Sequence, residues 1–244
     1  MLTRTSVFIA GVMVYLIFLL TMLYSIGFVG NLLVPKGIDD GLPSAPAIAI
    51  PLDLALIAVF GAQHSLMARP AFKSWWTSWI PKAMERSIFV LASSLALLFL
   101  FWQWRPIPVE VWNIQTGWAN TVLNSLFWLG WAGVVLSTFL IDHYDLFGLR
   151  QVYLYFRGVD YTSVPFKKPA LYNYIRHPMM LSFLIAFWAT PRMSVGHLIF
   201  ASGMTVVILM GIAFEERDLL KAYGETYRNY RRQVSMLIPL PRKK

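Results

Sequence analysis

A run of 27 residues without a charged side chain, from Val7 to Leu33, constrains this chain more than any other feature. A helix of about 20 apolar residues crosses the hydrocarbon core of a bilayer, where every backbone polar group needs a partner within the protein. The run also exceeds the apolar core of a cleavable signal peptide, which has about 7–15 residues. It therefore predicts a first transmembrane helix.

The composition extends this prediction to the whole chain. Its 244 residues are 57% hydrophobic and only 14% charged, with a mean hydropathy of +0.57, whereas about a quarter of an ordinary soluble domain is charged. There is no cysteine, which excludes disulfides, thiolate metal sites and a cysteine nucleophile. The net charge of +9 sits beside apolar segments. It therefore favours anionic lipid headgroups as a partner over nucleic acid.

Further apolar segments follow, and Pro191-Arg192 separates the last two. We expect an all-α, polytopic membrane helical bundle of five to six apolar segments. The last two form a hairpin, and the C-terminal third forms a cytoplasmic cofactor site. One domain is expected over 1–244, with a four-helix membrane part at 1–141 and a cofactor-binding part at 142–244. The apolar segments are 7–33, 47–68, 87–104, 118–141, 178–190 and 195–214.

The distribution of basic residues predicts the topology. All but three of the 21 Lys and Arg residues lie before the first segment, in 69–86, in 142–177 or after Glu216; the exceptions are Lys36, Arg105 and Arg192. Since cytoplasmic loops carry the excess of Lys and Arg, both termini are predicted to be cytoplasmic. The tail returns to that side only if the last two segments form a hairpin.

Arg176, His177 and Pro178 begin the fifth segment. Proline suits the first turn of a helix, where its missing N–H costs nothing. The free N–H groups of such a helix end attract carboxylate or phosphate, and Arg176 and His177 add donors. A basic cap at the membrane interface explains the same residues without a ligand.

Glu215 and Glu216 end the last apolar segment. Acids near a helix C-terminus oppose the helix dipole, so they need a counter-charge or a ligand. Arg217 is a possible structural partner, but two acids opposite an Arg-His pair across a hairpin favour a site. Tyr223, Tyr227 and Tyr230 follow at i, i+4 and i+7 and predict one face of an interfacial helix.

Asp142 and His143 lie where the fourth segment meets the cytoplasm, and His64 lies at the end of the second. An Asp-His pair can form an oriented general base, or simply a solvated helix end. A lone histidine such as His64 is more often a hydrogen-bonded structural residue. Two axial histidines could also hold a haem, which stays open at this point.

The C-terminal third resembles the isoprenylcysteine carboxyl methyltransferase superfamily of membrane enzymes. The resemblance covers about 70 residues: Tyr174-Ile-Arg-His-Pro178, the apolar hairpin, Glu215-Glu216, and Tyr223-Gly-x-x-Tyr227-x-x-Tyr230 before Ile238-Pro239. The common form has tyrosine and glycine where this chain has Met180 and Ser182.

Nearly the whole chain resembles the bacterial methanethiol S-methyltransferases, and NnrU-type membrane proteins share its His-Ser and Ala-Arg-Pro elements. The resemblance is carried by Gly27-Phe-Val-Gly-Asn31, Gln63-His-Ser-Leu-Met-Ala-Arg-Pro70 and Asp142-His-Tyr-Asp-Leu-Phe-Gly-Leu-Arg-Gln151. It implies methyl transfer from S-adenosylmethionine to the small volatile thiol methanethiol, giving dimethyl sulfide, in a bacterial inner membrane. This chemistry requires no metal ion, and the sequence indicates no obligate protein partner.

On this resemblance the cofactor contacts are expected from the C-terminal third, while a base or a cation would favour the reactive thiolate form of the acceptor. The expected cofactor-binding residues are Tyr174, Arg176, His177, Pro178, Met180, Glu215, Glu216 and Tyr227. The expected catalytic residues are His64, Asp142 and His143 as bases, with Arg69 or Arg150 as the cation.

Other functions remain open from the sequence. The same fold could methylate another small thiol or a lipid carboxylate. Membrane sterol reductases end in a similar tail and bind a nicotinamide cofactor, although they contain many more spans. An NnrU-like or haem-binding accessory protein is the third alternative.

Overall fold

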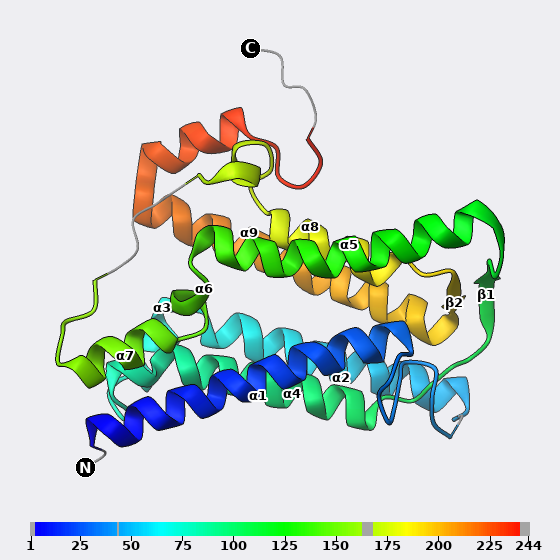
Figure 1. Ribbon diagram of the computed structural model, residues 1–244, viewed down its shortest axis with the longest axis horizontal. Helices are drawn as coiled ribbons and strands as arrows, with labels where there is room; N and C mark the ends of the chain where they lie inside the picture. The colour runs from blue at the N-terminus through cyan, green and yellow to red at the C-terminus, as the bar shows by residue number, and fades with distance from the viewer. Residues whose placement is uncertain (1–2, 43, 163–167, 240–244) are drawn as a thin grey trace. The chain divides into compact units, whose positions relative to one another are not determined.

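The computed structural model describes residues 3–42, 44–162 and 168–239, most of them in helices (Figure 1). The chain divides into two compact units. The first unit comprises Met1–Pro106 and Asp142–Pro165, and the second comprises Ile107–Ile141 and Phe166–Lys244. The fourth apolar segment thus shares a unit with the C-terminal third.

Three long helices build the first unit, and α4 packs against both of the others. Short helices join and flank them, and α7 packs on α1. The long helices are α1 (Arg4–Gly30), α2 (Pro46–Met67) and α4 (Glu85–Gln103). The short ones are α3 (Pro70–Trp76), the 3-10 turn η1 (Lys82–Met84), α6 (His143–Leu146) and α7 (Leu149–Arg157).

Polar contacts close one end of the first unit, where α4 ends. The Lys36 ammonium donates to the carbonyls of Trp102 and Trp104 at 2.6 and 2.8 Å. The Trp104 indole donates to the Ile38 carbonyl, and the Arg105 amide donates to Asp53. The last carbonyls of a helix lack intrahelical partners, so the lysine satisfies groups that hydrocarbon would leave unpaired.

The described part of the second unit contains two long helices, a short apolar helix and one pair of short strands. They are β1 (Glu110–Asn113), α5 (Gly117–Ile141), the 3-10 turn η2 (Ala170–Asn173), α8 (Pro178–Trp188), β2 (Arg192–Ser194) and α9 (Val195–Gln233). The strands pair antiparallel, and α8 packs against both α5 and α9. Ser194 caps α9 by accepting from the His197 amide.

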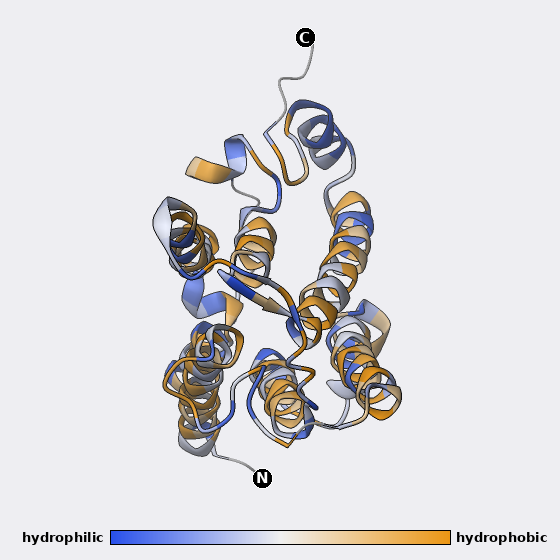
Figure 2. Cartoon of the chain, turned by 90° about the vertical axis from the view of Figure 1, so that its right-hand side faces the viewer, coloured by the Kyte–Doolittle hydropathy of each residue, from blue (hydrophilic) through white to orange (hydrophobic). Residues whose placement is uncertain are grey.

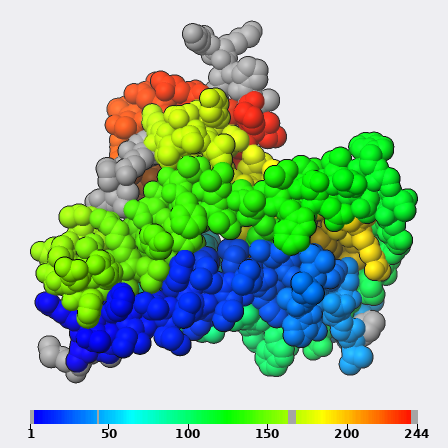
Figure 3. Space-filling model, viewed as in Figure 1, coloured from blue at the N-terminus to red at the C-terminus, as the bar shows by residue number. Residues whose placement is uncertain are grey.

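Small residues bring α5 and α8 into close contact. A Cβ atom added at Gly130 would lie 2.7 Å from the Ala186 nitrogen and 2.9 Å from the Ser182 carbonyl oxygen. One added at Gly133 would lie 2.5 Å from the Ser182 hydroxyl. Such approaches are typical of helix pairs in membranes, which associate through packing rather than through the hydrophobic effect. The opposite side of α5 is exposed along much of its length (Figure 3).

Helix α9 has an apolar first part and a polar last part (Figure 2). Gly224 interrupts it with φ 51° and ψ −124°, and the chain direction visibly changes there (Figure 1). A positive φ is readily adopted by glycine. Beyond the bend, Tyr227 and Tyr230 are buried with Val234 against Leu219 and Leu220.

The predicted all-α membrane fold is confirmed. Within the described residues, five helices are long and apolar enough to cross a membrane, and Pro178–Trp188 is a shorter apolar helix. The protein is therefore an integral membrane protein. The sequence did not indicate the strands β1 and β2, and the helix that contains the apolar segment 195–214 continues to Gln233. Tyr223 also lies before the bend, apart from Tyr227 and Tyr230.

We expect Gly130→Ala to destabilise the second unit by about 1–3 kcal/mol, because the new methyl group meets backbone atoms that cannot turn away. Gly211→Ala in α9 is the matched control: a Cβ there meets nothing within 4 Å, and alanine favours the helix. Thermal unfolding of both variants in detergent measures the difference. Equal melting temperatures would contradict the close packing of α5 on α8.

Candidate functional site

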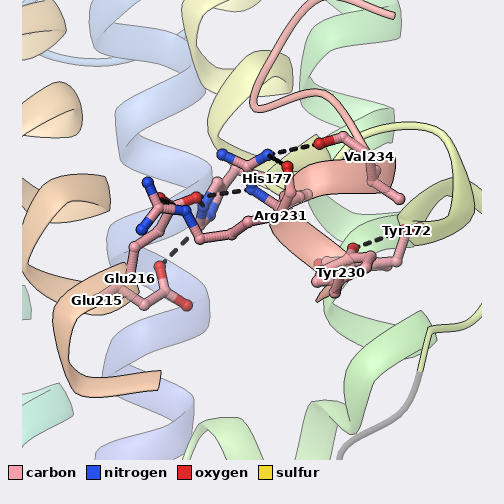
Figure 4. Close-up of polar contacts among 8 residues, drawn as sticks. Tyr172, His177, Glu215, Glu216, Tyr230, Arg231 and Val234 are labelled. Atoms are coloured by element: carbon pink, nitrogen blue, oxygen red, sulfur yellow. Dashed lines mark hydrogen bonds and ion pairs between the residues drawn. The ribbon is translucent and has the colours of Figure 1, made fainter. Parts of the chain in front are cut away.

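A buried ion pair organises the C-terminal third. The Arg176 Nε atom lies 2.7 Å from Glu216 Oε1, and both side chains are more than 90% buried. His177 Nε2 lies 3.2 Å from the same oxygen, while Arg231 Nε lies 3.1 Å from Oε2. Both oxygens of Glu216 therefore have partners within the protein (Figure 4).

The same arginine holds the C-terminal segment in place. Arg176 Nη1 donates to the carbonyls of Arg231 and Val234. The Arg176 amide donates to the Ser235 carbonyl at 2.8 Å, and the His177 amide to the Met236 carbonyl at 3.2 Å. The segment after α9 thus lies along the chain that enters α8.

These contacts modify the predicted anion site at the start of α8. The amides of residues 176 and 177 already donate to the C-terminal segment, so they are not available to an anion. The first amide to reach a carbonyl within the helix is that of Leu181, which donates to His177. The amides of Met179 and Met180 precede it in the first turn, where helix N–H groups have no helical acceptor.

Glu215 offers a more accessible carboxylate than Glu216. Its side chain is half exposed, and Oε2 lies 3.5 Å from His177 Nδ1. Near it, the Tyr230 hydroxyl donates to the Tyr172 carbonyl at 2.6 Å (Figure 4). Burial, followed by the charge of Glu215, raises the pKa of Tyr172, so this phenol stays protonated at neutral pH.

The remaining predicted cofactor residues differ in exposure. Pro178 is buried at the first position of α8, and Met180 is half-buried in the same first turn. Tyr227 is buried, whereas Tyr174 is 70% exposed. The structure therefore gathers Arg176, His177, Glu215 and Glu216 into one cluster and leaves Tyr174 on the surface.

A hollow of about 440 Å³ opens beside the end of α9. The hollow is an open depression of the surface rather than an enclosed cavity. Three of its lining residues are cationic, and Arg231 also contacts Glu216. The lining consists of Leu220, Arg228, Arg231 and Arg232.

Among the histidines of the first unit, His143 has the surroundings that best suit a general base. It is buried, and its Nε2 atom lies 2.7 Å from the Tyr15 hydroxyl. Burial lowers the pKa of His143, and the Asp142 charge offsets part of that shift. Asp142 Oδ1 accepts from the Asp145 amide and so begins α6, which fixes the backbone on which His143 is carried.

His64 and His143 border the same apolar cluster of the first unit. The His64 ring lies 4.9 Å from the Phe89 ring, and the His143 ring 4.9 Å from the Phe147 ring. Phe147 packs against the cluster that contains Phe89. His64 is itself exposed, with Nδ1 3.2 Å from the Ser93 hydroxyl.

The two predicted cations have different surroundings. Arg69 donates from Nε to the Ser65 carbonyl. Arg150 forms an ion pair with Asp145 at 2.9 Å and donates to Thr162. The hydrogen bond from Arg150 to Asp145 is the main cause of a raised Arg150 pKa.

Three residues that contact the predicted site residues were not predicted from the sequence. They are Tyr15, Asp145 and Arg231. Tyr15 is a polar side chain in the middle of an apolar run, a signal that marks functional positions in membranes. Asp145 stands in the quoted Asp-His-Tyr-Asp segment. Arg231 had no distinguishing signal among the basic residues of the tail, because its partner Glu216 is distant in sequence.

Comparison with known proteins identifies the family. The family model described as "NnrU protein" matches residues 54–226. The chain belongs to the NnrU protein family. It is 52% identical to the methanethiol S-methyltransferase of Crocosphaera subtropica, over 100% of this chain and 95% of that protein. The enzyme of that name from Mycobacterium tuberculosis is 51% identical, over 98% of both chains.

This NnrU family member also resembles a protein that is not named as a methyltransferase. Nurim of Sus scrofa is 30% identical over 71% of this chain and 70% of its own length. No solved structure matches the chain. Identity of about half along the full length places the chain in one family with the methyltransferases, and it supports a methyltransferase activity.

We expect Glu216→Gln to destabilise this family member by about 3–5 kcal/mol, because Arg176 then keeps a buried charge without its counter-ion. Glu225→Gln is the matched control, since Glu225 pairs with Arg228 on the exposed side of α9, where an ion pair contributes little. Thermal unfolding and tryptic cleavage near Arg231 measure both variants. A Glu216→Gln protein as stable and protease-resistant as the control would show that the pair does not hold the tail.

Proposed function

We propose that the protein transfers a methyl group from S-adenosylmethionine to methanethiol, giving dimethyl sulfide. The observation that carries the proposal is the identity of about half, along the whole chain, with proteins named methanethiol S-methyltransferase. The first-turn amides of α8, the half-exposed Glu215 and the arginine-lined hollow supply the anionic and cationic contacts that such a donor needs.

The second unit fits an amino-acid-bearing donor. Its methionine carboxylate suits the N-terminal end of α8, where the helix dipole is positive, or the hollow beside Arg228 and Arg232. Its ammonium suits Glu215, because both oxygens of Glu216 already accept from Arg176, His177 and Arg231. Met180 and the buried Tyr227 are two further cofactor-binding residues of the proposal, and both offer apolar surface.

The donor would supply a methyl group bound to its sulfonium sulfur. A lone pair of the thiolate sulfur forms the new S–CH3 bond while the bond between the methyl carbon and the sulfonium sulfur breaks. The electron pair of the broken bond stays on the leaving sulfur. The proton lost by the thiol needs an acceptor or water. We assign this role to His143 first, because burial lowers the pKa of its imidazole and so favours the neutral form that accepts a proton. His64 and Asp142 are the other bases, and Arg69 and Arg150 the candidate cations.

We place the protein in a bacterial inner membrane with both termini cytoplasmic. The basic residues that flank the spans support this orientation by the positive-inside rule. The bacterial relatives named above support the compartment. A volatile apolar thiol partitions into hydrocarbon, so an intramembrane enzyme meets its acceptor at high local concentration.

Headspace gas chromatography on detergent-solubilised protein given S-adenosylmethionine and methanethiol tests the proposal. We expect dimethyl sulfide in proportion to enzyme. No product, with S-adenosylmethionine binding still detected by calorimetry, would move the assignment to another small thiol or a lipid carboxylate. A Soret band in protein that neither binds the donor nor forms product would support the haem-binding alternative.

The pH dependence tests the assigned base. Because the His143 pKa is lowered and the neutral imidazole accepts the proton, kcat/KM should fall only below the ordinary histidine pKa of about 6.5. His143→Ala should lower kcat by about 100-fold or more and remove that limb. Near-normal rates after alanine replacement of His64, Arg69, Asp142, His143 and Arg150 in turn would exclude all five.

A further inference from the structure

Three arginines gather on one side of the polar last part of α9. Arg228, Arg231 and Arg232 stand at i, i+3 and i+4, which places them on one helix face, and all three are exposed. The opposite face is buried against the part of α9 that precedes the bend. Together with Leu220, the arginines line the hollow of about 440 Å³. This end of α9 therefore presents cationic groups around a space that opens to the surroundings.

The bend at Gly224 brings these arginines to the boundary of the membrane. The apolar segment of α9 ends at Phe214, and Glu216 follows it within about 3 Å along the helix axis. Because Arg231 Nε lies 3.1 Å from Glu216 Oε2, the basic part of α9 turns back to this level instead of continuing away from the membrane (Figure 4). The headgroup layer extends about 5–7 Å beyond the hydrocarbon on each side. The hollow beside Arg231 therefore lies at the level of the lipid headgroups.

This end of the chain carries an excess of positive charge. The sequence after Glu225 contains six Lys and Arg residues and no acidic residue. Glu216 pairs with Arg231, but it also neutralises the buried arginine that precedes α8. Glu225 pairs with Arg228 in an exposed contact, where an ion pair contributes little. Like charges on one helix face repel each other, so a bound anion would favour the observed arrangement.

The shape and lining of the hollow suit a phospholipid. A small-molecule site buries about 70–90% of its ligand, which an open depression does not do. A phospholipid is enclosed by the bilayer instead, because its acyl chains stay in the hydrocarbon and only its headgroup needs contacts from the protein. The planar fork of arginine matches the oxygens of a phosphate. Leu220 adds an apolar contact at the same place.

We propose that an anionic phospholipid binds this hollow, with its phosphate held by Arg228, Arg231 and Arg232. The inference depends on the membrane location of the protein and not on the methyl-transfer reaction. It leaves the first turn of α8 and Glu215 to the carboxylate and the ammonium of the methyl donor. Because Arg231 also contacts Glu216, the bound lipid stabilises the return of the C-terminal segment as well.

Arg228→Gln tests the proposal, with Arg192→Gln as the matched control. Arg228 pairs with Glu225 and its side chain is 55% exposed. Arg192 pairs with Glu110 and is 53% exposed, so each change removes one charge from an exposed ion pair. Native mass spectrometry of the detergent-solubilised protein, titrated with phosphatidylglycerol, measures the Kd of the lipid. We expect Arg228→Gln to raise this Kd about tenfold, as for loss of a hydrogen bond to a charged group, and Arg192→Gln to leave it unchanged.

Thermal unfolding gives a second readout, because a lipid that binds only the folded protein raises the melting temperature. We expect phosphatidylglycerol to raise it more than phosphatidylcholine, whose phosphate is offset by a cationic choline group. Arg228→Gln and Arg232→Gln should each reduce that difference. Equal shifts with the two lipids in the parent protein, or equal Kd values for Arg228→Gln and Arg192→Gln, would overturn the proposal.

Competition separates the lipid from soluble ligands. Phosphatidylglycerol binding to the parent protein is measured again with S-adenosylmethionine or inorganic phosphate in excess, each against sodium chloride at the same ionic strength. We expect neither to displace the lipid. Displacement by S-adenosylmethionine would assign the hollow to the methyl donor, and displacement by phosphate would make it a site for soluble anions; either result overturns the lipid site. None of these measurements requires turnover, so a failure to form dimethyl sulfide would contradict the proposed reaction alone.

Discussion

The buried carboxylate of Glu216 is the interaction on which the second unit depends. An ionised group of this burial is tolerated only with partners on its oxygens, and two distant parts of the chain supply them: Arg176 and His177 before α8, and Arg231 beyond the bend in α9. Because Arg176 also binds the carbonyls of Arg231 and Val234, one charge determines both the path into α8 and the return of the C-terminal segment.

This arrangement changes how the Arg-His-Pro and Glu-Glu elements are understood. Both were predicted as ligand contacts, and both supply structure first: the arginine and the second glutamate neutralise each other. A ligand in this cluster has to use what the pair leaves, which is the first turn of α8, the half-exposed Glu215 and the hollow lined by Arg228, Arg231 and Arg232. The stability of the site and its chemistry are therefore linked through residues that no substrate needs to touch.

The membrane fold could be predicted from the sequence because it depends on local quantities. The length of the uncharged run at Val7–Leu33 and the position of Pro178 each determine a helix within their own residues. The pairing of Glu216 with Arg231 across the Gly224 bend could not be predicted, since several basic residues of the tail were equivalent in sequence. Nor could the close contact of Gly130 with Ser182 and Ala186, because glycines in membrane helices look alike until the neighbouring helix is placed.

Helix α8 is too short to cross a membrane by itself. With 11 residues and about 1.5 Å of rise per residue, α8 is about half as long as the hydrocarbon core is thick, and it packs against the 25-residue α5. Gly130 and Gly133 of α5 lie against Ala186 and Ser182 of this short helix, and the buried Arg176–Glu216 pair holds the chain that enters it. A helix too short to cross the membrane by itself thus depends on close packing on one side and on a buried charge at its start.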